Sequence, residues 1–452
     1  MPDTHLLPPH AAFLALLIFL PFAAKWLSLQ VRLHLNRGRT RCLLRACALA
    51  AALFAPVVCQ RAARSAPAFI RSRGTQMMAG NVPFQPRGVN LGNWLVPEPY
   101  MMGGGHSNEQ IRLALQAAAG SEVKFETWRA AWRDNYITRL DIHRIKALGF
   151  NTVRVPLDWR DFEGGASSVG FRSLDPLLAW CRAEGVYVLP DMHVYPDTVG
   201  KGSVFVRSET EVSPDLDRVK AAWATVAQRY RNDPAILGYD LLNEPPGYHD
   251  DRLRPTYVQI RNAIRGVDTH HLIVVEPNIF SDLGTPGHWS LGRPLDAALA
   301  IAPHFYGGDV PASIDADLPT AANHYNGRKY LNWQYAWEYR VPIFVGETGE
   351  NSDAWIARMV GLWRTGKDGS GAGVLYWTYK KPGNAGGDLV TVPWTPGWAS
   401  IAHYLQDGGP VPPNAYSTMM EMAARTNARY ETFHPNIADA LQGHTPSRLV
   451  PR

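Results

Sequence analysis

Two hydrophobic patterns alternate along this chain, and the alternation restricts the folds that it can adopt. Short apolar runs rich in β-branched residues have the composition of buried strands, and helical periodicity fills most of the gaps between them. In one such gap, Leu216, Val219, Trp223, Val226 and Tyr230 recur at steps of three and four residues and share one helix face. Buried strands that alternate with helices predict a parallel sheet covered by helices.

The number of these runs makes the prediction more specific. The expected strands are Arg87–Asn93, Thr152–Trp159, Gly185–His193, Ile236–Glu244, His271–Asn278, Leu299–Tyr306, Pro342–Thr348 and Gly373–Tyr379. A second helical pattern runs from Leu253 to Val267, and a third from Phe125 to Leu140 leads into a helix that ends near Gly149. Eight strands and their helices predict an α/β fold, a (β/α)8 TIM barrel with long βα loops.

Most of the positive charge lies at the N-terminus. The 452-residue chain has a formal net charge of +5. Residues 1–73 hold ten of the 45 Lys and Arg residues but one of the 40 Asp and Glu residues, so this leader carries +9 and the remainder −4. A mildly acidic body argues against a footprint for a nucleic-acid backbone, so no nucleic-acid partner is expected.

The basic leader has the features of an export signal. Its apolar runs Ala11–Ala24 and Leu43–Val58 are each shorter than the roughly 20 residues of a membrane span. The second follows a cationic stretch and precedes small residues at Ser65–Ala68. We therefore predict a leader over 1–73, a single (β/α)8 domain over 74–452, and a periplasmic or secreted protein. The alternative is an uncleaved leader that anchors the protein in the inner membrane, facing outward.

Cysteine usage agrees with either compartment. Three of the four cysteines lie in the leader, and Cys181 alone lies in the body. The body therefore has no partner for an internal disulfide.

Candidate functional residues are the polar side chains at the strand ends, because the chemistry of a (β/α)8 barrel takes place at its C-terminal face. They are Arg154, His193, Asn243, Glu244, His304, Tyr306, Glu347 and Trp377. Glu244 and Glu347 each follow an apolar run, where a carboxylate buried without partners would be costly. Strands four and seven face each other across the barrel mouth, so we expect this pair to meet there.

Paired carboxylates are what glycoside hydrolysis requires, since one protonates the leaving oxygen while the other attacks the anomeric carbon. A separation of about 5–5.5 Å would mean retention through a covalent intermediate, and a wider gap inversion. Arg154 and Tyr306 could hold the nucleophile ionised and aimed, and Asn243 could contact a sugar 2-hydroxyl.

The remaining strand-end residues suit a sugar site. His193 and His304 could donate to sugar hydroxyls or tune the acid/base, and Trp377 offers a flat apolar face for a pyranose ring. Four further aromatics could extend the cleft, although core or loop packing explains each of them equally well. They are Trp94, Trp159, Tyr195 and Trp289.

The motifs that carry these residues resemble glycoside hydrolase family 5, the cellulase-like family of retaining β-glycosidases. The matching segments, between Pro83 and Gly383, are RGVNLGNWLVPE, GFNTVRVPLDW, VYVLPDMH, GYDLLNEPP, PHFYGG, IFVGETGE and GVLYWTYKKPG. The resemblance implies that Glu244 is the general acid/base and Glu347 the nucleophile of a double displacement. It implies no metal and no organic cofactor. The segment from Val89 to Leu95, with Glu98, looks like the branch with exo-acting and 1,3-glucan-cleaving members.

The expected partner is an oligo- or polysaccharide, and the leading interpretation is a β-glucanase, endo- or exo-acting. A different β-glycoside, such as mannan, 1,3-glucan or a glycolipid, remains an alternative substrate, because the motifs describe only the subsite of bond cleavage. A transglycosidase would share every residue named. A non-catalytic carbohydrate-binding protein is disfavoured because both glutamates are present. A metal-dependent hydrolase is disfavoured because His193, His304 and Asp191 are too scattered for a ligand set.

Overall fold

The structure is a computed structural model that describes residues 67–105, 107–198, 202–246, 250–277, 291–306, 336, 338–365, 372–383 and 386–442. Parallel strands form an eight-stranded central sheet in the order β11-β10-β9-β6-β5-β4-β13-β12. They are β4 (Arg87–Asn90), β5 (Thr152–Asp158), β6 (Tyr187–Val194), β9 (Gly238–Asp240), β10 (Leu272–Val275), β11 (Leu299–Ile301), β12 (Phe344–Gly349) and β13 (Gly373–Trp377). Each overlaps a predicted strand, so all eight are confirmed.

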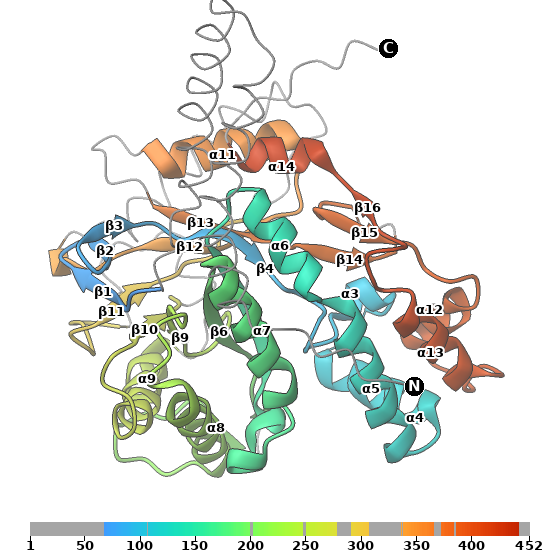
Figure 1. Ribbon diagram of the computed structural model, residues 1–452. Coiled ribbons are helices and arrows are strands. Elements are labelled where there is room, and N and C mark those ends of the chain that lie inside the picture. The colour runs from blue at the N-terminus through green and yellow to red at the C-terminus, as the bar shows by residue number, and fades with distance from the viewer. Residues whose placement is uncertain are drawn as a thin grey trace, which may run out of the picture. The chain divides into compact units, whose positions relative to one another are not determined.

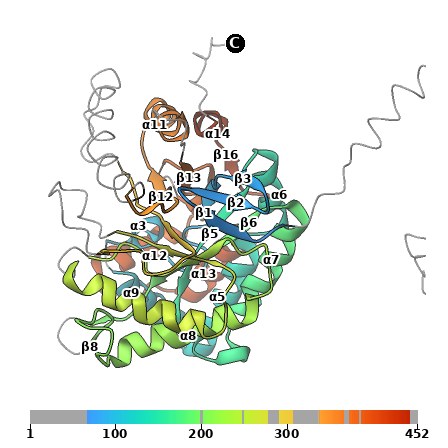
Figure 2. The same ribbon diagram turned by 90° about the vertical axis from the view of Figure 1, so that its left-hand side faces the viewer.

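The sheet closes on itself. Strands β11 and β12 stand at its two ends, and parallel bridges between Ile301 and Ile343 and between His304 and Glu347 join them. The helices pack around this sheet (Figures 1 and 2). The chain therefore folds into the predicted (β/α)8 barrel.

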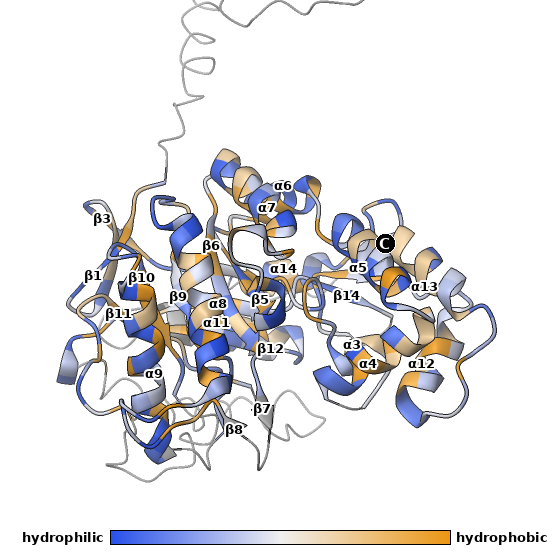
Figure 3. Ribbon diagram, turned by 90° about the horizontal axis from the view of Figure 1, so that it is seen from below, coloured by the Kyte–Doolittle hydropathy of each residue, from blue (hydrophilic) through white to orange (hydrophobic). Residues whose placement is uncertain are grey.

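The helices that follow the barrel strands are amphipathic, and polar and apolar residues alternate along them in Figure 3. In α8, the predicted face that includes Leu216, Trp223 and Tyr230 is buried. The helices between the barrel strands and after β12 are α6 (Arg139–Ala147), α7 (Phe171–Glu184), α8 (Pro214–Tyr230), α9 (Asp250–Arg265) and α11 (Asp353–Thr365), with short 3-10 turns at Trp159–Phe162 and Gly165–Ser167.

The long helical pattern after the first barrel strand is divided in two. Helix α5 (Glu122–Tyr136) ends where Ile137 takes an extended conformation, and Asp141 accepts from the backbone of Thr138 to begin α6. Leu140, which the spacing placed on the buried face of α5, belongs to α6 and is 45% exposed. A local N-terminal cap at Thr138 has overridden the continuous apolar spacing.

A second group of elements lies beside the barrel. Helices from the first βα loop pack against helices that follow the last barrel strand, and Figures 1 and 3 both show them side by side. From the first loop come α3 (Pro99–Met102), α4 (Asn108–Ala119) and α5, and from the C-terminal segment α12 (Trp398–Asp407), α13 (Ala415–Ala424) and α14 (Pro435–Leu441), of which α14 packs on α11. Small sheets comprise β14 (Lys380–Pro382), β15 (Val390–Val392) and β16 (Thr432–Phe433), and β7 (Asp197–Thr198) with β8 (Gly202–Ser203).

The barrel interior is apolar toward the strand N-termini. Leu189, Leu272, Phe344 and Leu375 form one buried cluster, while their strand neighbours Val188 and Ile273 belong to the core under the helices. This alternation is the two-residue period of a strand applied to the inside and outside of a barrel. The polar strand-end residues therefore lie above a packed apolar floor.

A small antiparallel sheet closes the N-terminal end of the barrel. It consists of β1 (Ile70–Arg73), β2 (Gln76–Ala79) and β3 (Val82–Phe84). Ile70 and Met77 join the interior cluster, and the Tyr187 hydroxyl donates to the Ala68 carbonyl at 2.9 Å. The fold therefore includes a strand on the leader side of the boundary drawn at residue 74. Among the described residues, no helix has the length and apolar character that a membrane crossing needs.

Candidate active site

The polar strand-end residues converge at the C-terminal face of the barrel. Glu347 is part of β12, and its backbone bridges to His304 beyond the end of β11. Glu244 lies beyond β9 with a φ of 44°, an uncommon conformation for a residue with a side chain. This strained backbone is held in place by its neighbours, which is a common property of active sites.

Arg154 is the centre of the site. Its buried guanidinium donates to Glu347 Oε1, to Asn243 Oδ1 at 2.9 Å and to Asp240 Oδ2 at 2.8 Å. Burial alone would lower the pKa of Arg154, but the surrounding carboxylates outweigh it and raise that pKa well above its usual value. Arg154 is therefore a permanent cation that stabilises the ionised form of Glu347.

Glu347 is the more enclosed of the two glutamates. Its side chain is 4% exposed, and the hydroxyl of Tyr306 donates to its Oε2 at 2.8 Å. Burial raises the pKa of Glu347, while the charges of His304 and Arg154 oppose that shift. Two donors thus orient this carboxylate and prepare it to act as an anion.

Glu244 is more open to solvent, with a side chain that is 32% exposed. Burial would raise its pKa, but a contact of 3.0 Å between its Oε1 and His304 Nδ1 brings that pKa below its usual value. These shifts favour the anion on Glu244, whereas a general acid must carry the proton. The order must reverse for the first chemical step.

The two carboxylates form a coupled pair. An oxygen of Glu244, an oxygen of Glu347 and a nitrogen of His304 all lie within 4.8 Å of one another. His304 Nδ1 also lies 3.4 Å from Glu347 Oε2, so the same nitrogen contacts both acids. At this spacing the glutamates share protons as a pair, and the charge on His304 helps to decide which of them is protonated.

His193 and Trp377 form a second part of the site. Their rings are parallel, with centroids 5.4 Å apart. His193 is held by Asp191 at 2.8 Å and by Glu98 at 3.3 Å. Burial would lower the pKa of His193, but these two acids raise it well above its usual value. A cationic imidazole therefore stacks on the indole, which is a favourable arrangement.

Trp377 is also tied to the first βα loop. Its indole N–H donates to the hydroxyl of Tyr100 at 2.7 Å, and that hydroxyl donates to Glu350 Oε1 at 2.6 Å. Lys381 pairs with the same carboxylate. A chain of contacts thus connects the aromatic wall of the site to the turn that follows Glu347.

The structure places the remaining predicted aromatics differently. Trp94 is 2% exposed, and its indole donates to the backbone of Arg133 at 2.8 Å. It packs under the first loop, apart from the glutamates, so it belongs to the core and does not line the cleft. Trp159 is buried near the guanidinium groups of Arg160 and Arg218, and the Tyr195 hydroxyl donates to the Asn243 carbonyl at 3.0 Å. Trp289 lies outside the described residues.

Several site residues were not predicted. They are Asn90, Glu98, Tyr100, Asp240, Glu276 and Glu350. Glu276 follows the apolar run of β10 just as Glu244 and Glu347 follow theirs, so the strand-end criterion could have found it. Tyr100 has no such signal because it lies in a loop helix.

The described residues include two groups of acids and histidines with the spacing of metal ligands. One is Glu244, His304 and Glu347, and the other is Asp191, Asp240 and Glu276. The second group already surrounds a cation, since Arg154 lies 3.1 Å from Asp191 and 2.7 Å from Glu276. An arginine thus neutralises the position that a metal would otherwise occupy.

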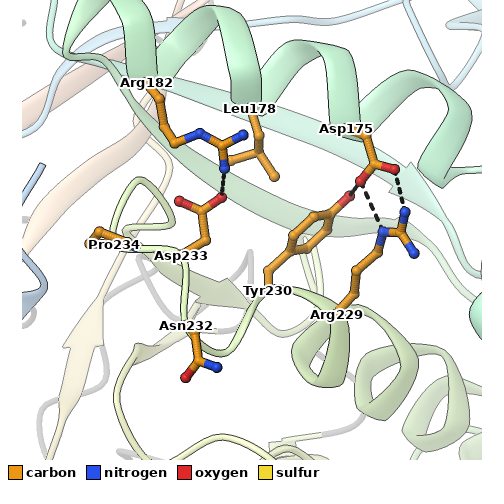
Figure 4. A pocket seen from close by; sticks show the side chains of 8 residues that line it. All are labelled: Asp175, Leu178, Arg182, Arg229, Tyr230, Asn232, Asp233 and Pro234. Atoms are coloured by element: carbon orange, nitrogen blue, oxygen red, sulfur yellow. Dashed lines mark hydrogen bonds and ion pairs between the residues drawn. The ribbon is translucent and has the colours of Figure 1, made fainter. Parts of the chain in front are cut away.

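A hollow of about 700 Å³ lies away from these strand ends, between α7 and α8 (Figure 4). Its charged side chains pair with one another, Arg182 with Asp233 and Arg229 with Asp175. Asp233 precedes β9, so the hollow belongs to the N-terminal side of the barrel, where residues serve stability. We assign it no part in the chemistry.

Comparison with known proteins agrees with this arrangement. A profile of the family described as Cellulase (glycosyl hydrolase family 5) matches residues 116–383. A β-xylosidase of Phanerodontia chrysosporium is 32% identical over 205 residues, which cover 43% of each chain. A glucan 1,3-β-glucosidase of Candida oleophila is 28% identical over 42% of this chain and 50% of the relative. The match thus spans about half the length of these two relatives or less.

A longer match includes a probable glucan 1,3-β-glucosidase A of Neosartorya fischeri, 25% identical over 67% of this chain and 84% of the relative. Among solved structures, an endogalactoceramidase aligns over 79% of this chain and 84% of its own, with a TM-score of 0.52 and 18% identity. Cel5A of Thermotoga maritima in complex with mannotriose aligns over 79% and 97%, with a TM-score of 0.50 and 16% identity. At these identities the two structures show the fold alone.

Proposed function

The chain belongs to the cellulase family, glycosyl hydrolase family 5, and from this premise we propose that it hydrolyses β-glycosides with retention of configuration. The observation that carries the proposal is the spacing of its two strand-end glutamates, which have oxygens within 4.8 Å of each other. Retaining glycosidases place their carboxyl groups about 5–5.5 Å apart, whereas inverting enzymes need about 6.5–9.5 Å to admit a water.

In the first step, Glu347 attacks the anomeric carbon while Glu244 gives its proton to the leaving oxygen. The C–O bond to the leaving group breaks, and a glycosyl ester forms on Glu347. Arg154 and Tyr306 stabilise the attacking carboxylate, with Tyr306 donating at 2.8 Å. In the second step, Glu244 takes a proton from a water that attacks the same carbon, and Glu347 leaves as a carboxylate.

The remaining strand-end residues bind the sugar that is cleaved. Asn243 accepts from Arg154 through Oδ1, so its amide nitrogen is the donor for a 2-hydroxyl. That contact strengthens as the oxocarbenium-like transition state forms. His193 donates to a sugar hydroxyl, and Trp377 supplies the apolar platform beside it.

The proposed substrate is a β-glucan or a β-glucan oligosaccharide. The relatives named glucan 1,3-β-glucosidases support a glucoside, and a 1,3-linked glucan therefore ranks next after a cellulose-like chain. Xylosides, mannans and glycosylceramides are weaker candidate substrates, because proteins with related folds or sequences carry those names. A transglycosidase would use the same residues and replace the water by a sugar hydroxyl.

A substrate panel tests this proposal. We expect turnover of an aryl β-glucoside and of at least one series of laminari- or cello-oligosaccharides, with the β-anomer as the first product seen by proton NMR. Aryl β-xyloside, β-mannoside and β-galactoside are the comparison substrates. An α-anomer as first product would contradict retention, and turnover confined to a comparison sugar would replace the glucan assignment.

We also propose that the basic leader directs export. Ala68 bonds to Tyr187 within the folded body, so processing is expected upstream of Ala68. N-terminal sequencing of the protein recovered from its native host tests this. A start at Met1 in a membrane fraction would support the anchor instead.

A further inference from the structure

Glu276 is a buried carboxylate that contacts three members of the site without being placed to touch the sugar. It follows β10, and its Oε2 accepts from the backbone N–H of Glu244 at 2.8 Å. Its Oε1 accepts from Arg154 Nη2 at 2.7 Å and lies 3.1 Å from His304 Nε2. No other described acid contacts the Glu244 backbone, Arg154 and His304 together.

We propose that Glu276 is a positioning residue, which fixes the backbone of Glu244 and keeps His304 charged between the two catalytic glutamates. The inference rests on the proposed roles of Glu244 and Glu347. It concerns how their shared protons are controlled and leaves the chemical steps unchanged.

The backbone contact addresses the strained conformation of Glu244. A φ of 44° places this residue in the left-handed region, which costs free energy unless neighbours hold it. A charge-assisted hydrogen bond from its own N–H to Glu276 does this directly. The position of the acid/base thus depends on a carboxylate from the adjacent barrel strand.

The contact with His304 addresses the charge in the site. One ring nitrogen of His304 contacts Glu244 and Glu347, and the other contacts Glu276. Burial would lower the pKa of His304, but Glu276 and Glu347 raise it well above its usual value. The further ionisable or charged groups around this cluster are Arg154, Asp191, Asp240, Tyr257 and Tyr306.

The direction of the pH effect follows from this geometry. Without the Glu276 charge, His304 loses its proton at a lower pH. The cation 3.0 Å from Glu244 is then absent at working pH, so the pKa of Glu244 rises. Removing the negative charge of Glu276 acts the other way, but from the far side of the imidazole, and is therefore the smaller effect.

The experiment compares Glu276→Gln with Asp268→Asn. Asp268 precedes β10 as Glu276 follows it, is buried, and also binds a histidine, with 2.6 Å between its Oδ2 and His271 Nδ1. We expect Glu276→Gln to lower kcat about 10- to 100-fold with little change in KM. We expect it to move the alkaline limb of the kcat/KM profile upward by about one pH unit. Asp268→Asn should lower thermal stability and leave that limb in place.

A second variant covers the case in which Glu276→Gln does not fold. Glu276→Asp keeps the charge but shortens the reach to the Glu244 backbone, so kcat should fall while the alkaline limb stays in place. A moved limb in Glu276→Asp, or an unmoved limb in Glu276→Gln, would overturn the proposal. Glu347→Gln in the same assay separates the two hypotheses, because its activity would refute the roles of the glutamates themselves.

Discussion

Replacing Glu347 with glutamine is expected to reduce turnover of aryl β-glucosides by a factor on the order of 10⁴–10⁶, the range seen when an enzyme loses its nucleophile. Glutamine keeps the size of the side chain and can still accept from Arg154 and Tyr306, which contact this carboxylate in the native site. It cannot form the glycosyl ester at a useful rate, because the neutral amide is a poor nucleophile. Steady-state kinetics on the purified variant measures the loss.

Glu431→Gln is the matched control for this variant. Glu431 is also a buried carboxylate in ion pairs, with a side chain that is 2% exposed and paired with Lys380 and Arg144. It lies outside the site, so its loss should reduce thermal stability and leave kcat close to that of the native protein. Rates for Glu347→Gln within about tenfold of the native value would remove Glu347 from the mechanism, since each factor of ten is only about 1.4 kcal/mol of barrier.

Replacing Glu244 with alanine is expected to produce a loss that depends on the leaving group. Poor leaving groups need protonation, so oligosaccharides should lose about 10²–10⁴-fold in kcat/KM. Activated aryl glucosides leave without that help, and their glycosyl-enzyme should accumulate because no base activates water. A small anion can then enter the space left by the side chain.

Azide rescue distinguishes this from general damage to the site. Azide should restore turnover of the activated aryl glucoside and yield a β-glucosyl azide, since it attacks the same face as water. It should do nothing for the native protein or for Glu347→Gln. An equal loss on all leaving groups, with no azide product, would assign Glu244 a structural role.

The sequence predicted those parts of the fold that depend on local periodicity. All eight barrel strands were found from apolar runs, because strands buried on both faces are short and continuous in composition. The small sheet from Ile70 to Phe84 was not predicted, because its strands are only three or four residues long and mostly exposed. The break between α5 and α6 depends on one cap at Thr138, which the apolar spacing does not reveal.

The same distinction holds for the site. The strand-end criterion selected eight residues, and the structure places them around Arg154 or beside Trp377. The criterion does not show which charges meet, since Arg154 and Glu276 are 122 positions apart in the chain and touch only after the barrel closes. Tyr100 was missed for the same reason, because its bond to Trp377 joins the first loop to the last barrel strand.

The most direct test of the central claim is mass spectrometry of the protein treated with an activated 2-deoxy-2-fluoro-β-glucoside, whose glycosyl ester hydrolyses slowly. If Glu347 is the nucleophile of a retaining enzyme, the intact mass should rise by one fluoroglucosyl group and the label should map to Glu347. A label on Glu244 would reverse the two roles. Hydrolysis of ordinary β-glucosides without any trapped ester, and with an α-anomer as first product, would contradict the double displacement.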